Sequence, residues 1–402
     1  MGLRSIKEIF ITGYGPSSSH TMGPFFASQW ILKKYPNAQH IEVTLYGSLA
    51  LTGKGHLTDY IIDLALKDVD HLIIFNKKTV KNHPNTMTFK VFDGKKTKIE
   101  NVISVGGGSI ITSDNINELE TKSVYPLQYM RDIKEHCKEH DISFYDYIIE
   151  HEDKDIEEYF RNVLKVMDDA YERGLKATGY LPGKLKVKRK AKDMYEAMEH
   201  TSLGLNDVAM NVAIASFAVA EENAAGGLIS TAPTCGSAGV IPGCIKYLRM
   251  KHVSDDNIVR GLMVAGLFGI ICKTNASVSG AECGCQAEIG VACSMGAAMI
   301  AFCFGKPIDD IVQAAEIALE HSLGLTCDPV DGYVQIPCIE RCAIYAIKAI
   351  NAVKLAIVIP NDSQHVSYDD SVRTKYLTGI DMNQKYKETS LGGLAEILTK
   401  GE

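Results

Sequence analysis

Cysteine is the residue type whose number and placement first indicate chemistry in this sequence. There are eleven cysteines among 402 residues, and eight of them lie from Cys272 to Cys342. An odd count, in a chain with no sign of export, makes a disulfide framework a poor explanation. In a reducing compartment such a group can hold a metal or cluster, supply reactive thiols or pack as small apolar side chains. The count alone leaves these three interpretations open.

Two of the cysteines stand in sequence that is typical of loops rather than of helix interiors. Cys327 precedes an Asp-Pro pair and Cys338 follows a proline. Thiolates from separate loops can converge on a cluster, whereas structural zinc usually takes two short Cys-x2–4-Cys pairs, and this sequence does not contain two of them. The ferredoxin spacings are absent too. Spacing therefore predicts a cysteine-rich region that can carry an iron–sulfur or other metal site, and it selects no ligand set.

Two polar segments near the N-terminus carry the other candidate groups. Residues 15–24 hold consecutive hydroxyls and a histidine between two Gly-Pro pairs, and such amides and hydroxyls can hold a carboxylate. Residues 46–59 run from a predicted strand through a glycine loop to a helix, where Lys54 and His56 can bind a carboxylate or move a proton. A plain helix N-cap or turn is the alternative for each. A phosphate loop is excluded, because the Gly-Lys-Ser/Thr ending is missing.

Two further segments are rich in small residues. Residues 221–239 end one helix and begin another through a loop of small polar residues. Such a loop can receive an anion at the helix N-terminus, or it can let two helices pack closely. The three glycines at 106–108 follow a predicted strand, and a structural turn is favoured there over an anion-binding loop.

The elements that must position these groups fall into two parts. The first part carries short alternating runs that predict strands at 41–51, 71–75, 87–92 and 99–105, with helices at 25–35 and 57–67. Charged helical sequence follows from 126 to 179, and the basic run 184–190 predicts a solvated linker. From Asp193 onward the pattern is helical. The sequence thus predicts an α+β fold, with an N-terminal α/β domain over 1–185 and an all-helical domain over 186–402.

Composition narrows the class of protein. A hydrophobic content of 46% and a charged content of 23% are typical of a soluble globular protein. The net charge of −7 gives no reason to expect a nucleic-acid partner. The N-terminus lacks a signal-peptide core, and no uninterrupted apolar run of membrane-spanning length is found. A cytoplasmic location with no membrane partner is expected.

Taken in order, these segments closely resemble the iron–sulfur L-serine dehydratases of bacteria. The most specific stretch is 319–351, which contains Leu-Thr-Cys-Asp-Pro-Val and Gln-Ile-Pro-Cys-Ile-Glu-Arg. The run from Asp381-Met382 through residues 385–395 matches as well. The resemblance covers most of the chain and is weakest from about residue 60 to 180.

The resemblance implies a fold, a cofactor and a reaction. The family joins an α/β domain to a helical catalytic domain that holds a [4Fe–4S] cluster through three cysteines, which match Cys285, Cys327 and Cys338. It uses no pyridoxal phosphate. One iron is left open to act as a Lewis acid. The resemblance implies that L-serine is converted to pyruvate and ammonia, and a homodimer is expected.

The resemblance also suggests roles for the polar segments. His56 is the first choice for the base that removes the Cα proton and His20 the second, with Lys54 helping to bind the carboxylate. The candidate substrate-binding residues are Ser18, Ser19, Thr21, Thr58, Asn223 and Thr234. These groups would have to reach the cluster within one chain or across a dimer interface.

Two departures from the family pattern leave alternatives open. Many single-chain members end in a cysteine that caps the fourth iron, and this sequence has none after Cys342. Cys235 stands where the family's Ala-Pro-Thr loop usually carries asparagine. A serine-binding regulatory homologue with altered catalysis is therefore the second hypothesis, and a thiol-based redox enzyme or zinc protein is the third.

Overall fold

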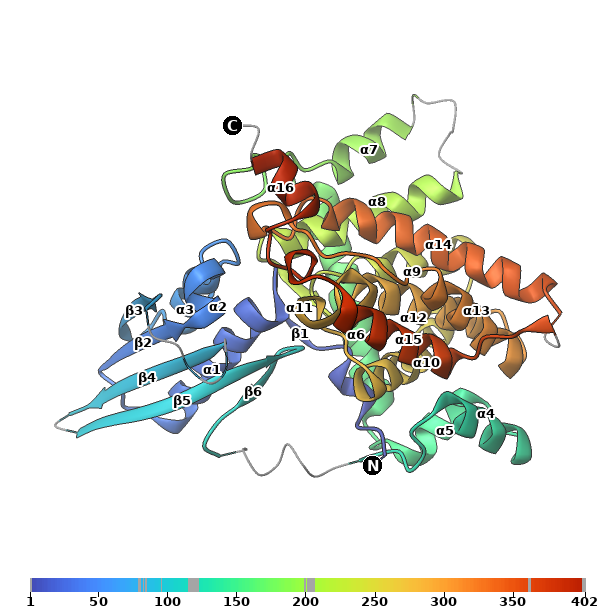
Figure 1. Cartoon of the computed structure of the whole chain (residues 1–402), viewed down its shortest axis with the longest axis horizontal. Coiled ribbons are helices and arrows are strands. Elements are labelled where there is room, and N and C mark those ends of the chain that lie inside the picture. Colours follow the sequence, from blue (N-terminus) through green and yellow to red (C-terminus); the bar gives the residue numbers. More distant parts are fainter. Residues whose placement is uncertain are drawn as a thin grey trace. The chain divides into compact units, whose positions relative to one another are not determined.

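The computed structural model divides the chain into two compact units (Figure 1). It describes residues 2–399 except 79–80, 82, 84, 95, 115–122, 199, 201–206 and 361–362. The smaller unit is Gly13–Lys122, and the larger unit combines Met1–Thr12 with Ser123–Glu402. The chain therefore leaves the larger unit after its first residues and returns to it at Ser123.

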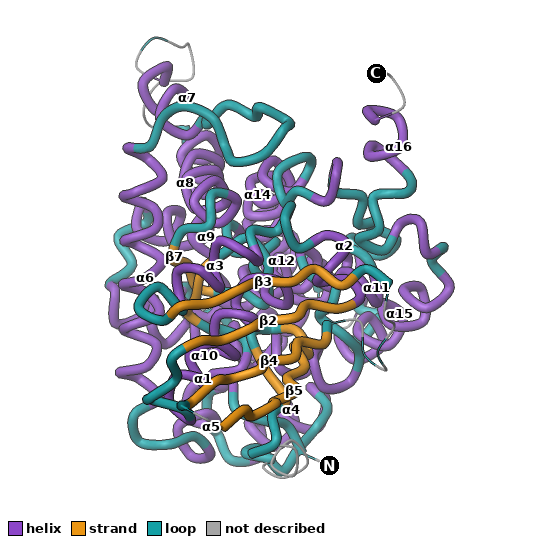
Figure 2. Tube along the Cα trace, turned by 90° about the vertical axis from the view of Figure 1, so that its left-hand side faces the viewer, coloured by secondary structure: helices purple, strands orange, loops and turns teal. Residues whose placement is uncertain are grey.

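The smaller unit is built on a five-stranded mixed sheet in the order β3-β2-β4-β5-β6 (Figure 2). Strand β2 pairs with β3 in parallel, and the other neighbours are antiparallel. The strands are β2 (His40–Tyr46), β3 (Asp70–Asn76), β4 (Thr86–Asp93), β5 (Lys96–Gly106) and β6 (Ser109–Ile111), and the helices are α1 (Gly23–Lys34), α2 (Gly47–Thr52) and α3 (Thr58–Ala65). Helices α2 and α3 form the crossover that a parallel pair requires.

Buried and less buried residues alternate along strand β2, and the buried residues form the face of the sheet that helices α1 and α3 cover. Ile41, Val43 and Leu45 of β2 are fully buried and share a core with Ile31 of α1 and Ile61 of α3. The residues between them lie on the opposite face, as the side-chain period of two requires. The predicted strands are thus confirmed, except that the strand expected at 41–51 ends at Tyr46 and continues as helix α2.

The larger unit is almost entirely helical. Its helices are α4 (Met130–Glu139), α5 (Phe144–His151), α6 (Ile156–Lys176), α7 (Ala191–Met198), α8 (Val208–Ala224), α9 (Val240–Met250), α10 (Asp255–Asn275), α11 (Gly280–Cys283), α12 (Ile289–Cys303), α13 (Ile308–Glu320), α14 (Cys338–Val358), α15 (Tyr368–Asp381) and α16 (Gly393–Thr399). The larger unit also contains the short strand β7 (Leu228–Ser230), and strand β1 (Thr12–Tyr14) begins at the last residue of its N-terminal segment. The sequence did not predict strand β7, because three residues are too few to show an alternation of apolar and polar side chains.

Helix α12 forms the centre of this unit. It packs against α9, α10, α13 and α14, and nearly every residue along it is buried. Helix α10 and residues 285–303 are long and apolar enough to cross a membrane by length and composition. However, 78% and 89% of their apolar windows are buried inside the protein, as expected for core helices.

The mixed composition of the fold agrees with the prediction of an α/β part followed by a helical part. The predicted boundary near residue 185 differs from the division into compact units, because helices α4 to α6 belong to the larger unit. Phe160 and Met167 of α6 lie in the same hydrophobic core as Phe217 of α8. The charged face of α6 was readable from the sequence, whereas the partner of its apolar face was not.

Candidate active site

Three separate segments of the larger unit carry Cys285, Cys327 and Cys338. Cys285 begins a single 3-10 turn just before α12, directly after Gly284, whose positive φ of 73° suits glycine. Cys327 lies in the loop after α13, and Cys338 is the first residue of α14. All three are buried, with exposed fractions of 3%, 3% and 8%. The loop that the sequence predicts is therefore found at Cys327, whereas Cys338 lies at the first position of a helix.

The C-terminal segment fixes the backbone of Cys327. The Cys327 amide donates to the Tyr386 carbonyl over 2.8 Å, and the Glu388 amide donates to the Cys327 carbonyl over 2.8 Å. Together they form a parallel bridge between Cys327 and Lys387. The segment 385–395, one of those that carry the resemblance described above, thus lies beside Cys327.

The thiols of Cys285 and Cys327 and a carboxylate oxygen of Glu288 all lie within 4.8 Å of one another. The pKa of the Cys327 thiol is raised well above its usual range, first by its hydrogen bond with Cys285 and then by burial. Burial, followed by the charge of Cys285, likewise raises the pKa of Cys338. Thiols that resist ionisation because they are buried side by side need a cation before they can become thiolates.

Arg341 brings a positive charge to this group of thiols. Its guanidinium donates to the Thr326 carbonyl over 2.8 Å and to Asp328 Oδ1 over 3.1 Å. It also interacts with the thiols of Cys285 and Cys338, which raise its own pKa against the opposing effect of burial. The guanidinium therefore partly offsets the negative charge that the thiolates would carry.

Glu288 is a residue that sequence reasoning passed over. Thr234 Oγ1 donates to Glu288 Oε1 over 2.7 Å, which places the predicted residue Thr234 beside the thiol group. Burial raises the pKa of Glu288, and the pKa of Glu388 is raised to about 8 by burial and by the neighbouring Glu288. The signal that could have found Glu288 is its spacing of three residues from Cys285, about one helical turn.

Asn223 and Cys235 are the other residues of the 221–239 segment that the sequence singled out. Asn223 is buried on α8 and Cys235 is buried in the loop before α9. The adjacent carboxylates are structural, since Glu222 pairs with Arg189 over 2.9 Å and Glu221 accepts the Lys190 amide over 2.7 Å. The substrate-binding role of Asn223 stays a prediction.

His20 and His56 lie together in the smaller unit. Their rings stack with centroids 4.6 Å apart, and both are buried. His20 hydrogen-bonds Ser19 Oγ through Nδ1 over 2.8 Å and Ser48 Oγ through Nε2 over 2.9 Å. Burial, and then the neighbouring His56, holds the pKa of His20 well below 6.5, and burial also lowers the pKa of His56. Both rings are therefore neutral at pH 7.

The hydrogen bonding of His56 fixes its tautomer. Nδ1 lies 3.1 Å from the Thr52 carbonyl oxygen, which can only accept, so Nδ1 carries the proton. Nε2 then holds a lone pair, and it is a buried nitrogen with no hydrogen-bond partner in the part of the chain that the structure describes. A neutral imidazole with an unused lone pair can accept a proton.

The remaining predicted residues surround this pair. Thr21 Oγ1 donates to the His56 carbonyl over 2.9 Å, and Thr58 Oγ1 donates to the His20 carbonyl over 2.6 Å, so each hydroxyl ties one histidine segment to the other. Ser18 is buried within the single π-helical turn Ser18–Met22. Lys54 is exposed, with Nζ 5.6 Å from the centre of the Phe75 ring. The structure thus gathers the N-terminal candidates in one unit and the cysteines with Thr234 in the other.

Comparison with known proteins gives the family. Residues 76–395 match the serine dehydratase alpha chain, and residues 5–70 match the serine dehydratase beta chain. The chain belongs to the serine dehydratase family. Membership makes it a lyase that carries both alpha- and beta-type parts in one polypeptide.

Named serine dehydratases align along nearly the whole chain. An L-serine dehydratase of Haemophilus influenzae is 37% identical, and the alignment covers 97% of this chain and 98% of the relative. L-serine dehydratase TdcG of Escherichia coli is 38% identical with the same coverage, and an L-serine dehydratase of Helicobacter pylori is 38% identical over 98% of this chain and 99% of its own. The alignments exceed 402 positions, so these relatives carry internal segments that this serine dehydratase lacks.

The donor set of this serine dehydratase fits an iron–sulfur cluster. Thiolates are soft ligands and favour copper(I), zinc and iron–sulfur clusters over hard cations such as Mg²⁺. Cys285, Cys327 and Cys338 are buried and electrostatically coupled, and an arginine stands beside them. Gly280 leaves space here, since an added Cβ would lie 2.5 Å from Glu288 Oε2 and 3.4 Å from Cys327 Sγ.

Proposed function

We propose that this chain is an L-serine dehydratase that converts L-serine to pyruvate and ammonia. The observation that carries the proposal is the buried thiols of Cys285 and Cys327 with Glu288 beside them and Cys338 interacting with Cys285, in a chain that aligns with L-serine dehydratases along nearly their full length. The proposal includes a cytoplasmic location and a homodimer, and it includes no pyridoxal phosphate.

Cys285, Cys327 and Cys338 are the residues proposed to hold a [4Fe–4S] cluster. When bound, a cluster with three protein thiolates supplies a Lewis acid that makes the serine hydroxyl a better leaving group. Arg341 stabilises the thiolates by its charge, and Asp328 and the Thr326 carbonyl hold the guanidinium in place. The burial of the three thiols keeps water and oxidants away from the sulfur atoms.

His56 is the residue proposed to take the Cα proton of serine at Nε2. Its pKa, lowered by burial, keeps the imidazole neutral, and the Thr52 carbonyl directs the proton to Nδ1 and the lone pair to Nε2. Loss of the proton and of the hydroxyl, as water, gives an enamine that tautomerises to an imine and hydrolyses to pyruvate and ammonia. Lys54 is proposed to bind the serine carboxylate, and His20 is the second choice of base.

The cluster is tested by metal and sulfide analysis of anaerobically reconstituted protein. Cys285→Ser should lose iron and acid-labile sulfide, together with pyruvate formation from L-serine. Cys283→Ser is the matched control, because Cys283 is also buried, lies two residues away and is not among the proposed ligands. Zinc without acid-labile sulfide would contradict the cluster. Serine binding without pyruvate release, on an intact cluster, would favour the regulatory homologue.

The base is tested separately from the cluster. His56→Gln should keep its iron and lose about 10²-fold or more in kcat, the range that general-base catalysis contributes. His71→Gln is the control, because His71 lies in the same unit but pairs with Asp63 over 3.0 Å. A His56→Gln protein with full iron content and near-normal kcat would remove His56 from the mechanism.

A further inference from the structure

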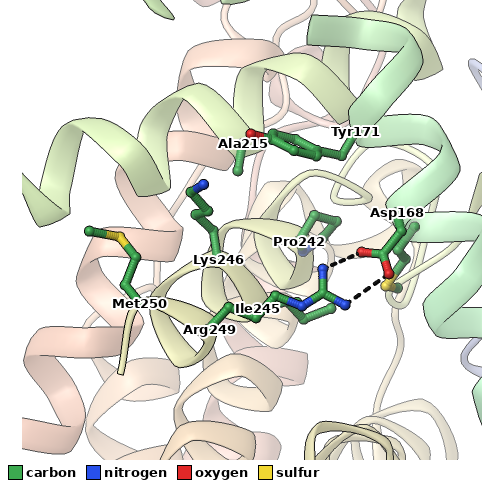
Figure 3. A pocket seen from close by; sticks show the side chains of 9 residues that line it. Asp168, Tyr171, Ala215, Pro242, Ile245, Lys246, Arg249 and Met250 are labelled. Atoms are coloured by element: carbon green, nitrogen blue, oxygen red, sulfur yellow. Dashed lines mark hydrogen bonds and ion pairs between the residues drawn. The ribbon is translucent and has the colours of Figure 1, made fainter. Parts of the chain in front are cut away.

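A cavity of about 240 Å³ lies in the larger unit between α6, α8 and α9 (Figure 3). None of the cysteines lines it, and it shares no residue with the group around Glu288. Most of its wall is apolar, with Met167 from α6, Ala215 from α8, and Pro242 and Ile245 from α9. The proposed reaction makes no use of this space.

One wall of the cavity carries a charge that is already neutralised. Arg249 donates to both carboxylate oxygens of Asp168, over 2.6 and 2.8 Å, as the dashed lines in Figure 3 show. Asp255 accepts a further hydrogen bond from the same guanidinium over 3.0 Å. Such a bidentate pair is rigid and has little capacity left for an additional anion.

The other charged group of the lining is Lys246. Its Nζ lies 5.7 Å from the centre of the Tyr171 ring, and no carboxylate lies within ion-pair distance of it in the described part of the chain. In Figure 3, Lys246 and Tyr171 lie above the Asp168–Arg249 pair. The cavity therefore joins an apolar interior to one ammonium group that lacks an anionic partner.

The size of the cavity limits what can enter it. Cavities of about 150 Å³ hold benzene, so 240 Å³ accommodates a ligand only modestly larger. We propose that this cavity binds a small monocarboxylate with a branched or cyclic apolar body. The apolar body would lie against Met167, Ala215 and Ile245, and the carboxylate would pair with Lys246.

The test uses isocaproate as the probe and measures its binding to the full-length, anaerobically prepared protein by titration calorimetry. Isocaproate should bind saturably, and its neutral amide should bind about tenfold more weakly, because the amide carries no negative charge to pair with the Lys246 ammonium group. Lys246→Gln should weaken isocaproate binding by a similar factor and leave amide binding unchanged. Lys251→Gln is the matched control, since Lys251 also lies over a tyrosine ring beside α9 but does not line the cavity.

A second variant tests the apolar part of the site. Ala215→Leu places extra carbon atoms in the cavity and should abolish binding of both probes while the far-ultraviolet circular dichroism spectrum stays unchanged. The proposal is overturned if isocaproate shows no saturable binding, or if Lys246→Gln binds it as tightly as Lys251→Gln does. Retention of binding by a folded Ala215→Leu protein would overturn it as well.

Discussion

The stability of the smaller unit should fall steeply as the pH drops below about 6.5, because His20 and His56 are buried as neutral rings. Their pKa values lie below the ordinary 6.5, so below that pH the unfolded chain binds protons that the folded unit excludes. At its steepest, the free energy of unfolding then decreases by about 1.4 kcal/mol per pH unit for each histidine, which is about 2.7 kcal/mol per pH unit for the two histidines together. The contribution is fully present above pH 6.5 and is lost on acidification.

The sequence supplies a reporter for this measurement. Trp30 is the single tryptophan of the chain and lies on α1 in the smaller unit, where its Nε1 donates to Asp114 over 3.1 Å. Tryptophan fluorescence during urea unfolding therefore follows this unit without contribution from the larger one. A range from pH 5.5 to 7.5 keeps the carboxylates ionised, since the pKa values of Glu100 and Asp114 are lowered from already acidic values.

Three variants separate the two histidines from other causes. His20→Gln and His56→Gln should each reduce the slope on the acid side, and the remainder includes the contribution of His83, whose pKa burial also lowers. His71→Gln should not reduce that slope, because hydrogen bonds to Val69 and Asp63 raise the pKa of His71 against the effect of burial, so His71 contributes to the pH dependence with the opposite sign. Its contribution is therefore present below pH 6.5 and is lost as the pH rises. A wild-type stability that is flat between pH 5.5 and 6.5, or an unaltered slope in both buried-histidine variants, would refute the assignment of two neutral rings.

Two further predictions concern the surroundings of Glu288. Thr234→Val removes the donor to Glu288 Oε1 and should lower pyruvate formation per bound iron by about tenfold, whereas Thr234→Ser should retain most of it; equal rates in the two variants would contradict a role for this hydrogen bond. Gly280→Ala places a Cβ 2.5 Å from Glu288 Oε2 and should cost about 1–3 kcal/mol in thermal unfolding and reduce iron content. Gly236→Ala, whose Cβ meets the same carboxylate at 3.5 Å, should do neither.

Much of the smaller unit could be predicted because its strands alternate. The pattern of β2 to β5 places one face in a core, and that signal is local to each strand. The crossover was harder, since Gly47–Thr52 has the apolar composition of a strand but forms helix α2. A segment of six residues carries too little periodicity for this choice to be made from its own sequence.

The cysteine group shows what spacing cannot supply. Cys285, Cys327 and Cys338 were selected from eleven cysteines by family resemblance, because convergence of three loops is a long-range property. The sequence did not identify Glu288 for the same reason. A carboxylate at the start of an apolar helix can be recognised as part of the site only once the fold places Cys327 and Thr234 beside it. The tautomer of His56 likewise depends on a carbonyl whose position only the folded chain defines.

The division of the chain has a consequence for its synthesis on the ribosome. Residues 1–12 belong to the larger unit, where Leu3 bridges to Tyr125 and Ser5 donates to Glu152 over 2.8 Å. All of the smaller unit is translated before Tyr125 and Glu152. It can therefore fold before residues 1–12 have any partner to pack against. Ile6, Ile9 and Phe10 must remain exposed until α5, α6 and α10 have left the exit tunnel. We expect the nascent chain to depend on chaperones during that interval, and fragments that begin after Tyr125 to lack part of the core.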